Sequence, residues 1–223
     1  AWDHINAFPT FEGYLAAFKS LLDQLPAGTP VVYDRSDPHL PELLEAYEHL
    51  NKFPYTMPDW TSANHQLVAR LNGDEYPLAM AGTHNLKNLA AACTASGLIG
   101  IPEKDCLAAM QTFKGAAKRL QRLIKTEEFQ LFRDFAHAPS KVKATLDGVK
   151  AQYPDFRLLA VLELHTFSSL SKAFLPQYHG TLASADEALV LINPKALDEK
   201  GSKDLTPAEI EAAFGPEPTP TVC

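Results

Sequence analysis

Short apolar runs that alternate with helical segments constrain the fold of this chain more than any other feature. The runs FRLLAVLEL (156–164) and EALVLI (187–192) read as buried strands, and the amphipathic segment 140–153 reads as a helix. Parallel strands need long crossover connections, and helices usually supply them. The alternation therefore predicts an α/β domain with a mainly parallel sheet, in which 156–164 is a central strand.

Helical and hairpin signals fill the first half of the sequence. The run VVYD (31–34) predicts a short buried strand, and Asn72-Gly73 lies between two apolar stretches, as in a tight β-hairpin. Apolar residues at helical spacing and prolines near helix starts predict helices over 11–25, 41–50, 82–100 and 102–113.

Three further elements are predicted in the second half. The segment 119–135 reads as two strands around a polar turn. The segment 170–185 reads as a helix that Pro176 bends, because proline cannot continue regular helical hydrogen bonding. The segment 206–215 reads as a helix that begins at an N-cap threonine and ends before a glycine.

Length and charge limit the class of protein. The chain has 223 residues, 46% of them hydrophobic, which is enough for two domains with cores of their own. The sequence pattern changes after Phe113, so we predict one domain over 1–112 and a second over 113–223. The net charge of −7 argues against a nucleic-acid partner, which would favour a basic face.

The sequence also argues against a membrane partner. No stretch approaches the roughly 20 apolar residues of a membrane span, and the first residues do not resemble a signal peptide. The cysteines are few, odd in number and far apart, which indicates a reduced, cytoplasmic compartment and core or incidental thiols: Cys93, Cys106 and Cys223.

Two candidate sites lie in the first half. Asp3-His4 opens the chain, although a lone histidine is more often structural than a ligand. Asn85 and Asn88 lie three apart and share one helical face, next to His84. An asparagine amide offers a donor and an acceptor that match an adenine edge, but helix capping is an equally good explanation.

Two more candidate sites lie in the second half. Lys118 and Arg119 are charged linker residues; such pairs are usually solvated, but an arginine can also reach a phosphate or a ribose. Asp134 and His137 follow a predicted strand, where open α/β sheets bind ligands. A plain loop role remains open for them.

The order of these sites resembles the Mur ligase family of ATP-dependent, amide-forming enzymes of peptidoglycan synthesis. The stretches that carry the resemblance cover nearly the whole chain: DH (3–4), GTHNLKNLAAA (82–92), FKGAAKRLQ (113–121) and RDFAHAPSKVKATL (133–146). The resemblance implies an α/β fold made of the end of a Mur-type central ATPase domain followed by a Rossmann-like C-terminal domain. It also implies ATP and Mg2+ as cofactors.

The resemblance implies roles for the nucleotide and metal residues. His4 would be a magnesium ligand or a near neighbour of one, with carboxylates and water supplying most of the shell. His84 and Asn88 would read adenine, with Asn85 beside them, and Asp134 would hold the ribose.

It implies catalytic and substrate roles as well. Arg119 would contact the ribose or the γ-phosphate region and stabilise developing charge. His137 and His165 would face the incoming amine, with Ser168 near them in the stretch LHTFSSL (164–170). The chain departs from the family pattern at two positions near this pocket, Arg133 and Ala138.

The stretch VLELHTFSSL (161–170) bears on the substrate. Alanine-adding members tend to place an arginine here, and this chain has none, so it resembles the branch that recycles murein peptide. The implied substrates are UDP-N-acetylmuramate and a murein tripeptide, or L-alanine if the alanine-adding branch is correct.

The chain contains no G-x-x-x-x-G-K-[ST] phosphate-binding loop. We therefore expect a catalytically incomplete fragment of an enzyme whose loop lies upstream and whose C-terminal domain is truncated. A non-catalytic nucleotide-binding module is the alternative from another functional class.

Overall fold

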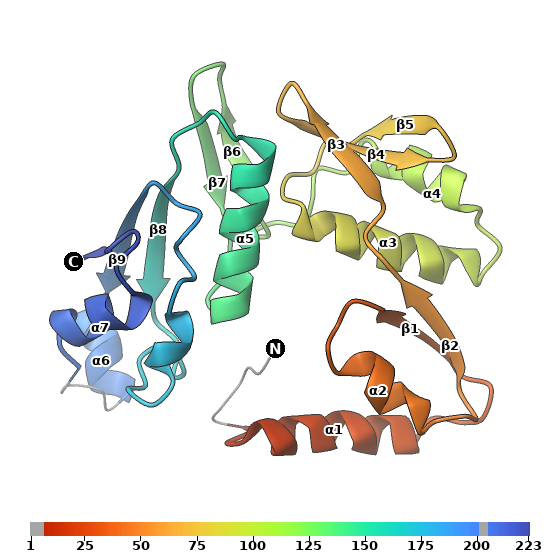
Figure 1. Ribbon diagram of the computed structural model, residues 1–223, viewed down its shortest axis with the longest axis horizontal. Coiled ribbons are helices and arrows are strands. Elements are labelled where there is room, and N and C mark those ends of the chain that lie inside the picture. The colour runs from red at the N-terminus through yellow and green to blue at the C-terminus, as the bar shows by residue number, and fades with distance from the viewer. Residues whose placement is uncertain (1–6, 201–204) are drawn as a thin grey trace. The chain divides into compact units, whose positions relative to one another are not determined.

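The computed structural model describes residues 7–200 and 205–223 and divides into two compact units (Figure 1). The N-terminal unit is Thr10–Ala116, and the C-terminal unit comprises the described residues from Ala117 onward together with 7–9. The division into domains over 1–112 and 113–223 stays a prediction from the sequence.

A parallel strand pair packed on two helices opens the N-terminal unit. The elements are α1 (Phe11–Asp23), β1 (Pro30–Asp34), α2 (Leu40–Glu45) and β2 (Asn51–Tyr55). Leu22, Leu44, Tyr47 and Leu50 form their core. The helix predicted over 41–50 ends at Glu45, because the chain turns there to enter β2, a strand that was not predicted.

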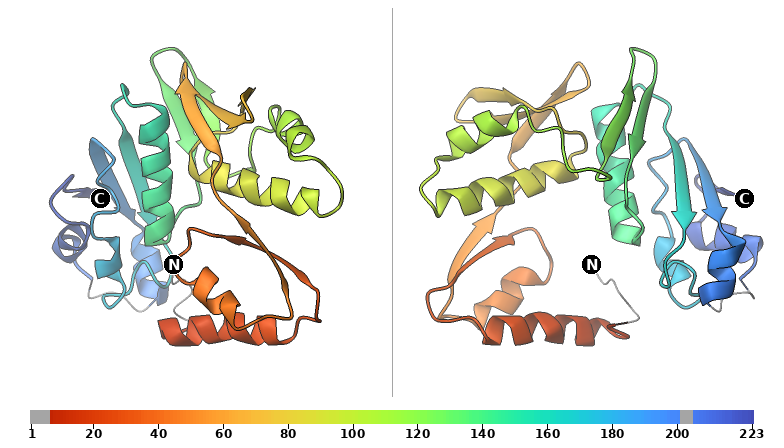
Figure 2. Two further views of the ribbon diagram at one scale, coloured as in Figure 1. Left: turned by 45° about the vertical axis from the view of Figure 1, so that its right-hand side comes forward. Right: turned by 180° about the vertical axis from the view of Figure 1, so that it is seen from behind.

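A three-stranded antiparallel sheet covered by two helices completes this unit (Figure 2). The elements are β3 (Asp59–Ala63), β4 (Gln66–Leu71), β5 (Asp74–Pro77), α3 (His84–Gly97) and α4 (Glu103–Met110). Asn72 and Gly73 both have positive φ, at 52° and 92°, which confirms the predicted hairpin turn. Their core includes Leu67, Leu78, Leu86, Leu89 and Leu107.

The C-terminal unit combines a hairpin with a parallel sheet. Its strands are β6 (Gln121–Lys125), β7 (Gln130–Arg133), β8 (Leu159–Leu164), β9 (Glu187–Ile192) and β10 (Thr221–Val222). Its helices are α5 (Pro139–Gln152), the 3-10 helix η1 (Leu175–Tyr178), α6 (Pro194–Lys200) and α7 (Pro207–Phe214). The hairpin β6–β7 is antiparallel and lies beside α5, while the other strands are parallel in the order β10-β9-β8.

The predicted α/β class is confirmed, but β8 is not the central strand that its apolar run predicted. Within the described residues β8 pairs with β9 alone and forms the edge of its sheet. Leu159 and Val161 are 53% and 57% exposed, whereas Ala160 and Leu162 are buried. Because residues on one face of a strand alternate with those on the other, β8 is covered on a single face. The sheets are also less parallel than predicted, since two of the four described are antiparallel.

The predicted helix over 170–185 is wrong. The segment forms turns and the short 3-10 helix η1, with Pro176 in its first turn. Proline donates no backbone hydrogen bond, and Leu170, Phe174 and Tyr178 are buried in the core without helical regularity. Among the helices of residues 7–200 and 205–223, none combines the length and apolarity of a membrane-crossing segment.

Candidate functional site

The start of α3 is fixed by a glycine and an asparagine. Gly82 has φ +82°, a conformation that side chains disfavour, and its carbonyl accepts from the Asn85 amide nitrogen at 3.0 Å. The Asn85 side chain donates from Nδ2 to the Ala81 carbonyl at 2.7 Å. Thr83 makes no side-chain capping bond. Asn85 therefore has a structural role in holding the beginning of this helix.

Asn88 differs from Asn85 in its surroundings. Its Nδ2 donates to Oδ1 of Asn85 at 3.1 Å, and its side chain is exposed. His84 is half-buried at the first position of α3. The amide of Asn88 is thus oriented by its neighbour and accessible to a ligand, whereas the Asn85 amide is already used within the chain.

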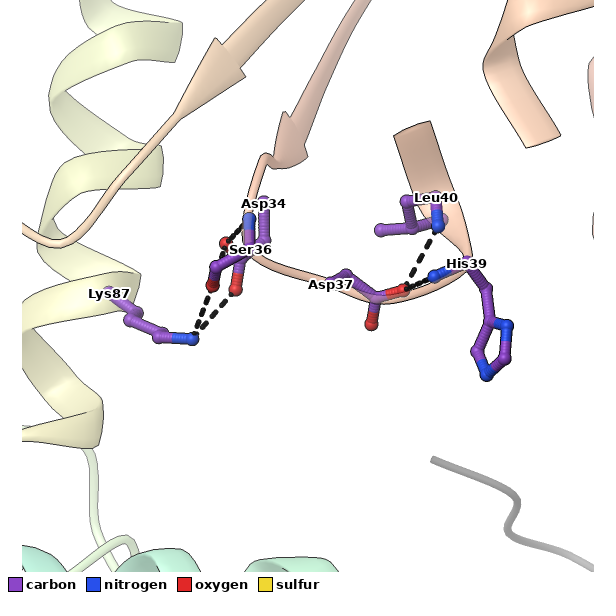
Figure 3. Close-up of polar contacts among 6 residues, drawn as sticks. All are labelled: Asp34, Ser36, Asp37, His39, Leu40 and Lys87. Atoms are coloured by element: carbon purple, nitrogen blue, oxygen red, sulfur yellow. Dashed lines mark hydrogen bonds and ion pairs between the residues drawn. The ribbon is translucent and has the colours of Figure 1, made fainter. Parts of the chain in front are cut away.

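An ion pair that sequence reasoning missed ties α3 to the end of β1 (Figure 3). Oδ1 of Asp34 accepts from the backbone nitrogen and the hydroxyl of Ser36 at 2.8 and 2.7 Å. Oδ2 of Asp34 accepts from Lys87 Nζ at 3.0 Å. Burial opposes ionisation of Asp34, but the bonds from Ser36 and the Lys87 ammonium outweigh it and lower the pKa of the carboxyl. The pair connects β1 to the residue next to Asn88.

The turn after β1 carries a second carboxylate. Oδ1 of Asp37 accepts from the backbone nitrogens of His39 and Leu40 at 2.9 and 3.0 Å, at the start of α2 (Figure 3). An Asp followed two residues later by Ser and then by another Asp is a turn signal, which the sequence displayed directly after the predicted strand 31–34.

In the C-terminal unit, Asp134 lies just beyond the end of β7. Its Oδ1 accepts from the Phe135 nitrogen at 2.6 Å, and its Oδ2 accepts from the Thr145 hydroxyl on α5 at 2.8 Å. A carboxylate has about four lone-pair sites. Asp134 is therefore held in place and keeps acceptor capacity for further hydroxyl groups.

Three of the predicted site side chains, Arg119, His137 and His165, gather around the exposed ring of Phe135. The guanidinium carbon of Arg119 lies 5.5 Å from the ring centroid of Phe135, which is 45% exposed. The Phe135 ring lies 4.9 Å from that of His137 and 6.0 Å from that of His165, and the two histidine rings are 6.1 Å apart. Phe135 was missed by sequence reasoning, although it stands between Asp134 and His137 in the quoted motif.

Backbone carbonyls orient both histidines. Nδ1 of His137 is 2.9 Å from the Phe135 carbonyl, and Nδ1 of His165 is 3.2 Å from the Glu163 carbonyl. A carbonyl oxygen only accepts, so each Nδ1 carries the hydrogen in these contacts, and each Nε2 of a neutral ring is an acceptor. The Tyr178 hydroxyl also donates to the His137 carbonyl.

The loop after β8 has both structural and exposed polar groups. The Thr166 nitrogen donates to Ser169 Oγ at 2.9 Å, and the Ser169 nitrogen donates to Thr166 Oγ1 at 3.1 Å. Ser169 is buried, and these reciprocal bonds close the loop. Ser168 lies half-buried between them in sequence. The candidate metal ligand His4 lies outside the described residues.

Several described side chains offer groups that suit parts of a nucleotide. No group of three or more histidine, cysteine or acidic side chains in 7–200 and 205–223 is arranged to hold a metal, so no step is assigned to Mg2+. Asp134 offers acceptors suited to ribose hydroxyls, and Arg119 offers donors suited to phosphate oxygens.

The sequence is similar to those of several UDP-N-acetylmuramate–L-alanine ligases. A UDP-N-acetylmuramate–L-alanine ligase from Bifidobacterium longum subsp. infantis is 34% identical over 140 residues, which are 62% of this chain and 27% of the relative. Another, from Pelotomaculum thermopropionicum, is 27% identical over 225 residues, which are 95% of this chain and 48% of the relative. No protein-family model matches the sequence.

Solved structures share the fold. The alanine ligase MurC of Thermotoga maritima matches with a TM-score of 0.63 and 19% identity, over 99% of this chain and 48% of the other. A murein peptide ligase of Psychrobacter arcticus matches with a TM-score of 0.59 and 20% identity, over 94% of this chain and 46% of the other. The folylpolyglutamate synthase of Mycobacterium tuberculosis, solved with ADP, matches with a TM-score of 0.67 and 18% identity. The match covers 100% of this chain and 50% of the other.

The fold is therefore the one that Mur ligases and folylpolyglutamate synthase have in common. Both the sequence and the fold of this chain are thus similar to those of Mur ligases. The chain spans about half or less of the length of these relatives.

Proposed function

We propose that this chain is part of an ATP-dependent ligase that joins UDP-N-acetylmuramate to an amine through an amide bond. The observation that carries the proposal is the gathering of Arg119, His137 and His165 around Phe135, beside Asp134. The names of the sequence relatives supply the muramate substrate.

The residues of the C-terminal unit suit the amide-forming step. ATP, when bound, supplies the phosphoryl group that activates the carboxylate. The amine nitrogen attacks the activated carbonyl carbon, phosphate leaves, and the nitrogen loses a proton. A neutral histidine Nε2, at His137 or His165, accepts such a proton. The Arg119 guanidinium stabilises negative charge that develops on oxygen, and Asp134 positions a ribose through its free lone pairs.

For the N-terminal unit we propose the adenine contact at the start of α3. Asn88 presents an oriented, exposed amide, which can pair with a base edge. His84 and Asn85 stand beside it, and Asn85 acts through its hydrogen bond to Asn88. The Mg2+ role of His4 and the cytoplasmic location stay predictions from the sequence.

The amine substrate has two candidates. We propose a murein tripeptide, because the loop after β8 carries His165 and Ser168 and, over 164–170, no arginine to bind the carboxylate of a single amino acid. The second candidate is L-alanine, which the names of the curated relatives favour.

The test is an assay of the protein expressed from its complete gene. ADP release should require UDP-N-acetylmuramate together with an amine substrate. Absence of ADP release with every amine offered, in a protein shown to be folded, would refute the proposed ligase.

A further inference from the structure

Two of the three cysteines, which the sequence suggested were core or incidental thiols, are neighbours in the core of the N-terminal unit. Sγ of Cys93 on α3 and Sγ of Cys106 on α4 are 2.7 Å apart, and both residues are free thiols. Their exposed fractions are 4% and 9%. The contact joins two helices that pack in one apolar cluster with Leu89 and Leu107.

The separation of the two sulfurs is close to that of a bond. Sulfur atoms in a disulfide lie about 2 Å apart, so a side-chain shift of less than about 1 Å would bring Cys93 and Cys106 to bonding distance. Both residues belong to the buried apolar cluster of α3 and α4, in which the two thiols lie against each other.

A small reagent can reach one of the thiols. A pocket of about 390 Å³ is lined by Cys93, by Thr94 and Gly97 of α3, and by the residues that lead into α4. Glu103 is the charged residue of this lining. A small, uncharged reagent is therefore favoured over an anionic one.

We propose that Cys93 and Cys106 are a modification site at which a small oxidant, such as a hydroperoxide or a diazene, forms a reversible disulfide. With a diazene, the first sulfur adds to one nitrogen of the N=N bond. The second sulfur attacks the first, forms the S–S bond and expels the hydrazine, which carries both thiol protons. The two sulfurs are oxidised, and the diazene is reduced by two electrons.

The surroundings of Cys93 determine the rate of this oxidation. Burial raises the pKa of the Cys93 thiol, and the hydrogen bond with Cys106 and the charge of Glu103 act in the same direction. The thiolate is the reacting form, so oxidation should be slow at neutral pH and faster as the pH rises.

The experiment uses the full 223-residue chain with Cys223→Ser, which removes the exposed third thiol. The folded protein is treated with diamide and analysed by intact mass and by peptide mapping after alkylation. The expected result is a mass lower by two hydrogens, a cross-linked peptide pair that contains Cys93 and Cys106, and full recovery of both thiols with dithiothreitol.

Two thiols that still alkylate after prolonged diamide treatment at raised pH would overturn the proposal, as would an adduct at one cysteine without a cross-link. Cys106→Ala in the same background is the matched control, in which Cys93 should form no internal cross-link. If that variant does not fold, the unaltered chain is oxidised and its peptides are mapped. Cross-links between Cys93 and Cys106 must then be more abundant than cross-links to Cys223.

Discussion

Asn88 donates its side-chain nitrogen to the side-chain oxygen of Asn85 at 3.1 Å, and Asn85 in turn donates to the Ala81 carbonyl at 2.7 Å. This short chain of bonds assigns different tasks to two asparagines that look alike in the sequence. Asn85 fixes the start of α3, and Asn88 offers an acceptor and a second N–H to a ligand.

Asn88→Ala should therefore raise the KM for ATP of the protein from its complete gene. Loss of one neutral hydrogen bond is worth about 0.5–1.5 kcal/mol, which corresponds to a several-fold change. The KM for UDP-N-acetylmuramate should change less and serves as the internal control. An unaltered KM for ATP in a folded variant would exclude the adenine contact.

The Asp34–Lys87 pair should contribute measurably to stability. Asp34→Asn should lower the free energy of unfolding by about 0.5–1 kcal/mol, a modest value because the Lys87 side chain is 43% exposed. Urea unfolding of Asp34→Asn, Lys87→Met and the double variant measures the coupling between them.

The matched control for that pair is Arg70–Glu75, whose side chains are 48% and 56% exposed. Arg70→Met should change the unfolding free energy by less than about 0.5 kcal/mol. Equal losses for the two pairs would mean that the Asp34 site has no special part in holding α3.

Glu209 should make stability depend on acid pH. It accepts from Lys172 at 2.8 Å and from Thr206 in the capping box of α7, and these bonds lower its pKa from 4.5 to about 2. The lowered pKa favours the folded state above pH 4.5, and this contribution is lost as the pH falls through about 2.

Glu209→Gln should therefore lower the thermal midpoint at pH 7, and the difference from the unaltered chain should shrink as the pH approaches 2. The effect should be small, since Glu209 is exposed. Glu211→Gln, on the same helix but outside the capping box, is the control. A difference that grows on acidification would contradict the assignment.

The 223-residue chain by itself should release no ADP in the presence of ATP, UDP-N-acetylmuramate and an amine. Phosphoryl transfer depends on positioning and on charge stabilisation by a phosphate-binding loop and metal ions, and no G-x-x-x-x-G-K-[ST] sequence is present. Release of ADP that both substrates stimulate would show that other residues perform this task.

His165→Ala should lower turnover with a tripeptide and leave ATP binding nearly intact. The ring lies beside His137 and Phe135, and its Nε2 is available as an acceptor. Steady-state kinetics of the protein from its complete gene, with tripeptide and with L-alanine, separates the two amines. A higher kcat/KM for L-alanine would replace the recycling assignment by the alanine-adding one.

Local signals predicted a large part of this fold. The hairpin at Asn72-Gly73 and the helix that begins after Thr206 were found because a few adjacent residues determine them. The exposed face of β8 was not found, since its run of apolar residues reads the same in an edge strand as in a central one. The turns around Pro176 replaced a predicted helix because tertiary packing outweighed apolar spacing.

The candidate site was predictable in its motifs and not in its contacts. Asp134, His137 and His165 stood out by sequence pattern, whereas Phe135 at their centre carries no polar signal. Cys93 and Cys106 meet because α3 and α4 pack side by side, and no spacing in the sequence shows that packing.

Tyr178 lies at the centre of the C-terminal core, with no exposed surface, and its ring packs 5.1 Å from that of Phe214. Its hydroxyl donates to the backbone carbonyl of His137. Substitutions in the core around Tyr178 and substitutions in the loop that contains His137 are therefore not independent during evolution. A substitution of Tyr178 by phenylalanine keeps the aromatic ring in the core but removes the hydrogen bond to the His137 carbonyl. Related proteins with substitutions in the core around position 178 should also have compensating substitutions near position 137.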